Sequence, residues 1–113
     1  MELLIIILNR EEHLEKILSL LIESGITGAT ICETQGIGQF LAYEVPIFAG
    51  LKQFPGEGKT ASKTILALLE EGDSYERFKK LLIDENIDFT KPQVGLLITV
   101  PVSNVVKPPR EYE

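Results

Sequence analysis

Cysteine, histidine and positive charge are all scarce in this chain of 113 residues. It has one cysteine and one histidine, so these two residue types can form neither an internal disulfide nor a zinc site of their own. The chain has 11 lysines and arginines against 17 aspartates and glutamates, a net charge of −6. This balance argues against a nucleic-acid partner, because contacts to phosphates need a clustered cationic surface.

Long hydrophobic runs are absent as well. The longest one, at 3–8, is too short to span a membrane, and Glu2 stands where a signal peptide would carry positive charge. Hydrophobic residues make up 44% of the chain and charged residues 25%, which is ordinary for a globular domain. We therefore expect a cytoplasmic protein with a single domain over residues 1–113.

Hydrophobic patterns predict four strands. Residues 3–8 are apolar at both parities, which is typical of a strand buried on both faces. Residues 27–34, 63–70 and 94–102 are predicted to be strands as well, with successive side chains pointing to opposite faces.

Two helices are predicted between these strands. Asn9 is the expected N-cap of the first and Gly25 its stop, while Asp73 is the expected N-cap of the second and Asn86 its stop. The apolar stripes of the two helices are Leu14, Ile17, Leu18 and Leu21, and Tyr75, Phe78, Leu81 and Leu82.

The order strand–helix–strand–strand–helix–strand predicts an α+β fold, the ferredoxin-like βαββαβ sandwich with a four-stranded antiparallel sheet. Two helices can cover only one face of such a sheet, whereas the strands at 3–8 and 94–102 are apolar, or nearly so, on both faces. The second face therefore needs a further cover, either the long loop or another subunit. We interpret the chain as an obligate oligomer built sheet to sheet.

A long connection joins the second and third strands. Residues 35–58 hold five of the nine glycines and also a run of apolar and aromatic side chains. Connections of more than about 12–15 residues in so compact a domain are usually functional. The residues that we expect to contact a partner from this loop are Phe40, Tyr43, Ile47 and Phe48.

No set of residues in the sequence shows the pattern of a catalytic site. Glu11 and Glu12 precede His13 where a helix starts, and the helix dipole explains such carboxylates without any chemistry. Cys32 stands in mid-strand among apolar neighbours, as a small buried side chain would. We expect neither an enzyme nor a metal site. Gly36–Ile37–Gly38 offers backbone amides that an anion could approach, although a turn or a bulge would need the same glycines.

Residues 25–38, GITGATICETQGIG, closely resemble the end of the first helix, the second strand and the loop entrance of the nitrogen regulatory PII signal-transduction proteins. This resemblance implies a homotrimer that binds an adenine nucleotide between subunits. It also implies signalling to a membrane transporter or an enzyme through an extended loop, here 39–58. The positions that match the nucleotide pocket are Leu8, Thr30, Gly36, Ile37 and Gly38, with Lys107 and Arg110 near the place of two arginines beyond the last strand.

The chain departs from the PII pattern at the phosphates. The glycine- and lysine-rich turn of the family is replaced by residues 90–95, and its loop glutamine falls at Phe40. The resemblance thus implies a divergent PII-like protein with a C-terminal tail at 107–113. The alternative is a divalent-metal-tolerance trimer similar to the CutA family, which shares the fold.

Overall fold

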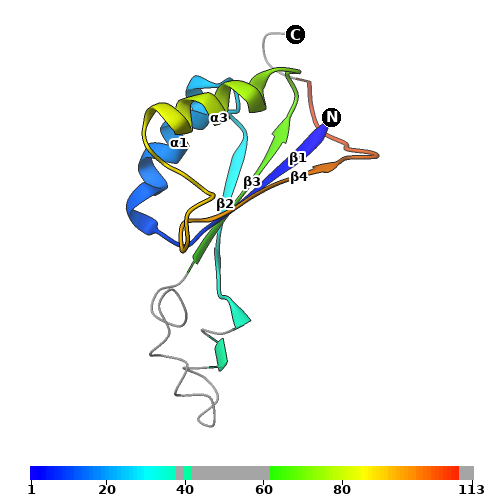
Figure 1. The fold of residues 1–113 in the computed structure, drawn as a ribbon. Helices are drawn as coiled ribbons and strands as arrows, with labels where there is room; N and C mark the ends of the chain where they lie inside the picture. Colours follow the sequence, from blue (N-terminus) through cyan, green and yellow to red (C-terminus); the bar gives the residue numbers. More distant parts are fainter. Residues whose placement is uncertain (38–39, 42–61, 110–113) are drawn as a thin grey trace.

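The computed structural model describes residues 1–37, 40–41 and 62–109. The elements whose bounds it gives are four strands and two helices, as predicted, together with one short 3-10 turn (Figure 1). Ile37, Phe40 and Leu41 are helical as well. In chain order the elements are β1 (Glu2–Leu8), the turn η1 (Glu11–His13), α1 (Leu14–Glu23), β2 (Ala29–Thr34), β3 (Ser62–Leu69), α3 (Ser74–Asp84) and β4 (Gly95–Pro101). Of the predicted site residues, Gly38, Tyr43, Ile47, Phe48 and Arg110 lie outside the described residues.

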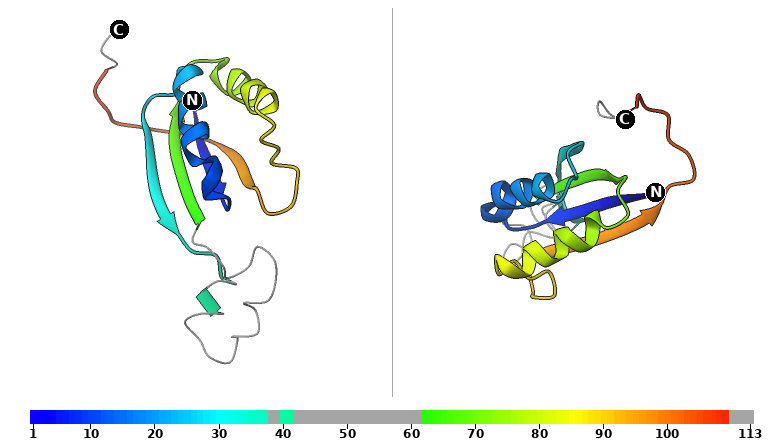
Figure 2. Two further views of the ribbon diagram at one scale, coloured as in Figure 1. Left: turned by 90° about the vertical axis from the view of Figure 1, so that its left-hand side faces the viewer. Right: turned by 90° about the horizontal axis from the view of Figure 1, so that it is seen from above.

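The strands form one antiparallel sheet in the order β2-β3-β1-β4. β1 and β3 are therefore central, which explains why β1 is apolar at every position from Leu3 to Leu8. Both helices lie on the same side of the sheet, and they stand in front of the strands in the left view of Figure 2. The fold is thus α+β with a four-stranded antiparallel sheet and two helices, an arrangement compatible with the ferredoxin-like plan.

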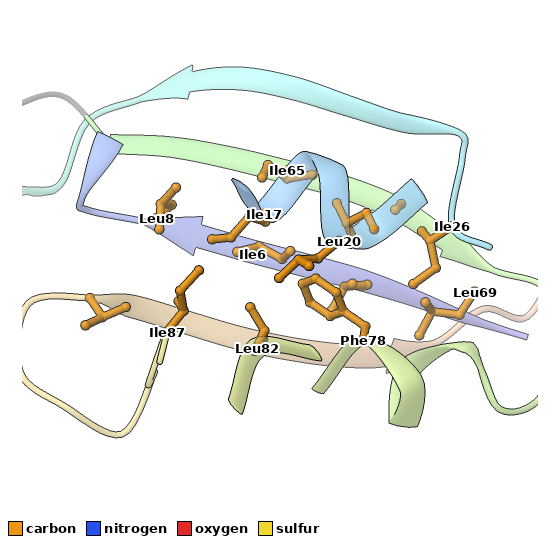
Figure 3. Packing of buried hydrophobic residues seen from close by; sticks show 14 residues of the cluster. Ile6, Leu8, Ile17, Leu20, Ile26, Ile65, Leu69, Phe78, Leu82 and Ile87 are labelled. Carbon is orange, nitrogen blue, oxygen red and sulfur yellow. The ribbon is translucent and has the colours of Figure 1, made fainter. Parts of the chain in front are cut away.

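The hydrophobic core lies between this sheet and the two helices. Phe78 of α3 is fully buried and points toward the strands, while Ile17 and Leu20 of α1 fill the space beside it (Figure 3). Each such side chain stabilises the fold by about 1.5–3 kcal/mol relative to full exposure. The strand residues that close the core from the other side are Leu4, Ile6, Leu8, Ile65, Ala67 and Leu69.

Both helices end in the same hydrogen-bonded motif. After α1, Gly25 has a φ of 86° and Ile26 N–H donates to the Leu21 carbonyl at 2.8 Å. After α3, Asn86 has a φ of 59° and Ile87 N–H donates to the Leu82 carbonyl at 3.0 Å. These are Schellman motifs, in which a residue of positive φ lets the chain turn back and satisfy the last carbonyls. The two helix stops predicted from the sequence are confirmed.

The predicted helix starts need correction. Asn9 is no N-cap: its backbone N–H donates to the Val94 carbonyl at 3.0 Å and so continues the β1–β4 ladder. α1 begins after His13, whose side chain makes no capping hydrogen bond. Asp73 does stand at the N-cap of α3, but its carboxylate pairs with Arg77 rather than with the helix amides. The Asp73 carboxylate is thus taken by an arginine one turn further along the same helix. Asn9 still belongs to the strand ladder, and α1 begins five residues after it.

We call the sheet face opposite the helices the open face, and none of the described strand residues on it is charged. The cross-strand register pairs Leu3 with Leu68, Ile5 with Ile98, and Cys32 with Thr64, so these residues share one face. Most of its aliphatic side chains are only half-buried, and Leu96 is 56% exposed. The open face consists of Leu3, Ile5, Ile7, Thr30, Cys32, Thr34, Ser62, Thr64, Leu66, Leu68, Leu96, Ile98 and Val100.

Candidate functional site

The glycine-containing entrance of the long connection lies where β2 ends. Gly36 and Ile37 follow β2 after Gln35, and Ile37 is 79% exposed. A helical turn starts here, because the Phe40 N–H donates to the Gly36 carbonyl at 3.0 Å. A Cβ placed on Gly36 would meet no atom of the described residues within 4 Å. Thr30 lies four residues before Thr34 on the same strand face, and it is exposed. The described part of the predicted pocket therefore forms an accessible strip along β2.

A cluster of hydroxyl groups joins β2 to β3 beside this entrance. Thr34 Oγ1 lies 2.9 Å from Ser62 Oγ and 2.9 Å from Thr64 Oγ1, and its hydroxyl also lies 3.2 Å from the Ser62 carbonyl oxygen. Each hydroxyl can both donate and accept, so the cluster keeps unused bonding capacity on the open face. We did not predict Ser62 and Thr64 as site residues. Their small hydroxyl side chains are visible in the sequence, but only the register of β2 and β3 shows that they lie opposite Thr34 and Cys32.

An ion-pair group holds the same end of the two strands on the helix side. Lys63 of β3 pairs with Glu33 of β2 and, at 3.6 Å, with Glu11 of η1. The hydrogen bond from Lys63, together with its charge, lowers the pKa of the Glu33 carboxyl below its usual range. The same bond to Glu33 raises the pKa of Lys63. The two strand ends that border the long connection are thus fastened on both faces of the sheet.

Acid is expected to weaken the folded state. The pKa values of Glu33 and Asp73 are lowered by hydrogen bonds from Lys63 and Arg77, respectively, so both carboxylates stabilise the fold at neutral pH. Because a lowered carboxyl pKa favours folding above the unfolded value, this contribution is lost as pH falls below about 4.5. Urea midpoints measured from pH 7 down to about pH 3 should decline, and less steeply in the Glu33→Gln/Asp73→Asn variant. Equal slopes for both proteins would contradict this origin.

Two of the predicted pocket residues lie away from the entrance. Leu8 ends β1 on the helix side and is 0% exposed, so a ligand cannot reach it in the single chain. Lys107 lies in the extended segment after β4, and its ammonium group pairs with Glu70 at 2.8 Å. Glu70 follows the last residue of β3, whereas Gly36 lies near the first residue of that strand. At about 3.3 Å per strand residue, roughly 20 Å separates these two ends.

One chain therefore cannot bring Lys107 to Gly36 in this arrangement. Their ends of the sheet are opposite, as Figure 1 shows for the cyan and red segments. A pocket that includes both residues would need them from two different copies of the chain. Of the predicted ligand-binding set, the structure places only Gly36 and Ile37 next to each other, with Phe40 close behind in sequence. Thr30 lies on the same strand six residues earlier, roughly 20 Å away along β2.

The turn before β4 has no row of free glycine amides. The Asp88 carboxylate accepts hydrogen bonds from the Thr90 amide at 2.9 Å and from the Thr90 hydroxyl at 2.6 Å. Gln93 has a φ of 70°, and Gly95 packs directly against the backbone of Ile7. Lys91 is exposed, and its charge is the one feature of a phosphate site that this turn retains.

Comparisons of the chain with protein-family models and with curated proteins found no significant match. Among the described residues no group of three or more histidines, cysteines or carboxylates is placed to hold a metal ion. In the same part of the chain, neither helix has the length and apolar character needed to cross a membrane.

Proposed function

We propose that this protein is a small-molecule-responsive regulatory protein of the PII type. Three copies of a ferredoxin-like chain would pack through their open faces, and an effector would bind in the clefts between them. The protein would act on an enzyme or a transporter through residues 39–58. The observation that carries this proposal is the uncharged, largely aliphatic open face that runs up to the Gly36 entrance.

The open face favours association for a simple energetic reason. Its aliphatic side chains from β1, β3 and β4 are half-buried within one chain, although complete burial of each is worth about 1.5–3 kcal/mol. A face without charges also loses no ion hydration when it is covered. Contiguous apolar surfaces of this kind usually mark interfaces. Association would also supply the second copy that a pocket containing both Gly36 and Lys107 requires.

The chemistry of the strip along β2 favours the uncharged part of a nucleotide. Thr30, Thr34 and Thr64 offer hydroxyl groups, and none of the described strand residues on their face of the sheet is a lysine or an arginine. Lys63, the nearest lysine in sequence, lies on the helix side and is held by two carboxylates. Hydroxyl groups suit a ribose or a base, whereas phosphates require cations or free amides. The proposed effector is therefore an adenine nucleotide bound mainly through its nucleoside.

Adenine nucleotides should accordingly bind weakly, with little gain from additional phosphates. Each missing charge-assisted hydrogen bond removes about 1.5–3 kcal/mol, tenfold or more in affinity. Titration calorimetry with adenosine, AMP, ADP and ATP should give dissociation constants that do not tighten toward ATP and that are independent of magnesium. Submicromolar, magnesium-dependent ATP binding would contradict the proposal.

A variant pair tests where the nucleoside binds. Thr30→Ala should weaken AMP binding roughly tenfold, because it removes one hydrogen-bonding hydroxyl at the strip. Thr27→Ala, an equally exposed threonine just before β2, should leave it unchanged. If no adenine compound binds but divalent cations raise the melting temperature, the CutA-like alternative is favoured instead.

A further inference from the structure

A hollow of about 480 Å³ lies beside the outer edge of the sheet, on the helix side. Its apolar wall comes from Leu82 of α3, from Phe89 in the segment that follows α3, and from Leu97 of β4. Ile83, at its rim, is 73% exposed. None of these residues belongs to the candidate site along β2. The hollow is the place where the core between α3 and β4 reaches solvent.

The backbone of β4 is unpaired along this hollow. Two hydrogen bonds fix the phase of the β1–β4 ladder: Asn9 N–H donates to Val94 O, and Val102 N–H donates to Met1 O. In an antiparallel ladder such pairs alternate, so the even-numbered residues of β4 bond β1. The odd-numbered residues Leu97 and Thr99 therefore turn their N–H and C=O groups outward, where no strand follows in the described sheet.

The length of this free edge is limited at both ends. Gly95 begins β4 with a positive φ, and Pro101 ends it at another outward-facing position without an N–H group. Prolines at such positions are a common protection of edge strands against pairing with other chains. The donors at Leu97 and Thr99 are left between them, and Leu97 lines the hollow. The unprotected length suits a segment of about five extended residues.

Two lysines give the rim of the hollow a positive character. Lys79 of α3 forms an ion pair with Glu76 at 3.2 Å. Lys91 has no carboxylate of the described residues within ion-pair distance, although, together with the hydrogen bonds from Thr90, its charge helps to lower the pKa of Asp88. The one carboxylate in the lining, that of Asp88, is engaged by Thr90. In a chain of net charge −6, an edge flanked by two lysines complements an acidic partner.

We propose that β4 and this hollow form a docking site for an extended acidic segment of another protein, which adds as a fifth strand. The segment would bond the N–H and C=O groups of Leu97 and Thr99, and every second side chain would face the hollow. Apolar residues at those positions would contact Leu82, Phe89 and Leu97, and flanking carboxylates would pair with Lys79 and Lys91. Strand addition derives affinity from the backbone and specificity from such alternate pockets. The proposal does not depend on nucleotide binding.

Amide exchange on the full chain tests this proposal directly. In the free protein the amides of Leu97 and Thr99 should exchange fast, while those of Leu96 and Ile98, bonded to β1, should be protected. A displayed library of random ten-residue peptides selected on the protein should yield acidic sequences with apolar residues at alternate positions. A synthetic peptide of that sequence should slow exchange at Leu97 and Thr99 at least tenfold.

Variants separate strand addition from other binding modes. Thr99→Pro removes an outward N–H without breaking a bond to β1 and should weaken the peptide at least tenfold, whereas Thr99→Val keeps the N–H and should bind normally. The double variant Lys79→Glu/Lys91→Glu should also weaken peptide binding at least tenfold. It keeps the test possible if the Thr99→Pro protein does not fold. The proposal would be overturned if the Leu97 and Thr99 amides were already protected in the free protein, since the edge would then pair with a second copy. It would also be overturned if the selection enriched no peptide, or if the peptide bound Thr99→Pro as tightly as it binds the unaltered protein.

Discussion

Replacing Gly95 with alanine is expected to detach the start of β4 from β1 and to destabilise the fold by about 3 kcal/mol or more. Gly95 has a φ of 146°, a conformation that residues with a side chain rarely adopt. A Cβ at this position would overlap the carbonyl oxygen of Ile7 and would lie 3.2 Å from the Leu8 Cα. Because both are backbone atoms of a central strand, they cannot move aside without breaking the ladder.

The matched control for this substitution is Gly28→Ala. Gly28 precedes β2, and a Cβ there would meet no atom within 4 Å. Chemical denaturation should place the Gly28→Ala midpoint near that of the unaltered protein and the Gly95→Ala midpoint far below it. A Gly95→Ala protein of unchanged stability would show that β4 does not start as described.

Replacing Ile5 with glutamate should dissociate the proposed trimer into folded monomers. Ile5 lies in the centre of the open face, between Leu66 of β3 and Ile98 of β4. In a single chain this position is half-buried, so a carboxylate there remains partly hydrated. Covered by another copy, the same carboxylate would lose its water without gaining a cation, at a cost of several kcal/mol per subunit. Light scattering should report a mass about one third of that of the unaltered protein.

The same chemical change on the other side of the molecule is the control. Ile22 of α1 is 64% exposed, so Ile22→Glu should leave the mass unchanged. Circular dichroism should show that both variants keep their helices and strands. If Ile5→Glu retains the mass of the unaltered protein, the open face is not the interface.

Local patterns in the sequence predicted the described elements well. Strict alternation sufficed for β2 and β3, and Gly25 and Asn86 ended the helices as residues tolerant of positive φ should. The Asn9 prediction was wrong because a cap signal is local, while the ladder bond to Val94 comes from the other end of the chain. The sequence shows the local cap signal, but it does not show which distant residue will bond to Asn9.

The candidate site was harder to predict for the same reason. Gly36 and Thr30 could be singled out because they stand in one short motif. The pairing of Lys107 with Glu70 depends on how the segment after β4 crosses the end of β3, which no local pattern reports. The constraint on Gly95 likewise arises across a ladder from Ile7. Properties that depend on register or on a second copy need the fold before they can be recognised.

The mass of the protein in solution tests the central claim most directly. Size exclusion coupled to light scattering at micromolar concentration should give three times the chain mass of 12.6 kDa, because in the proposed trimer the other copies would cover the uncharged open face of each chain. A single species of 12.6 kDa would contradict both the shared interface and the cleft between subunits.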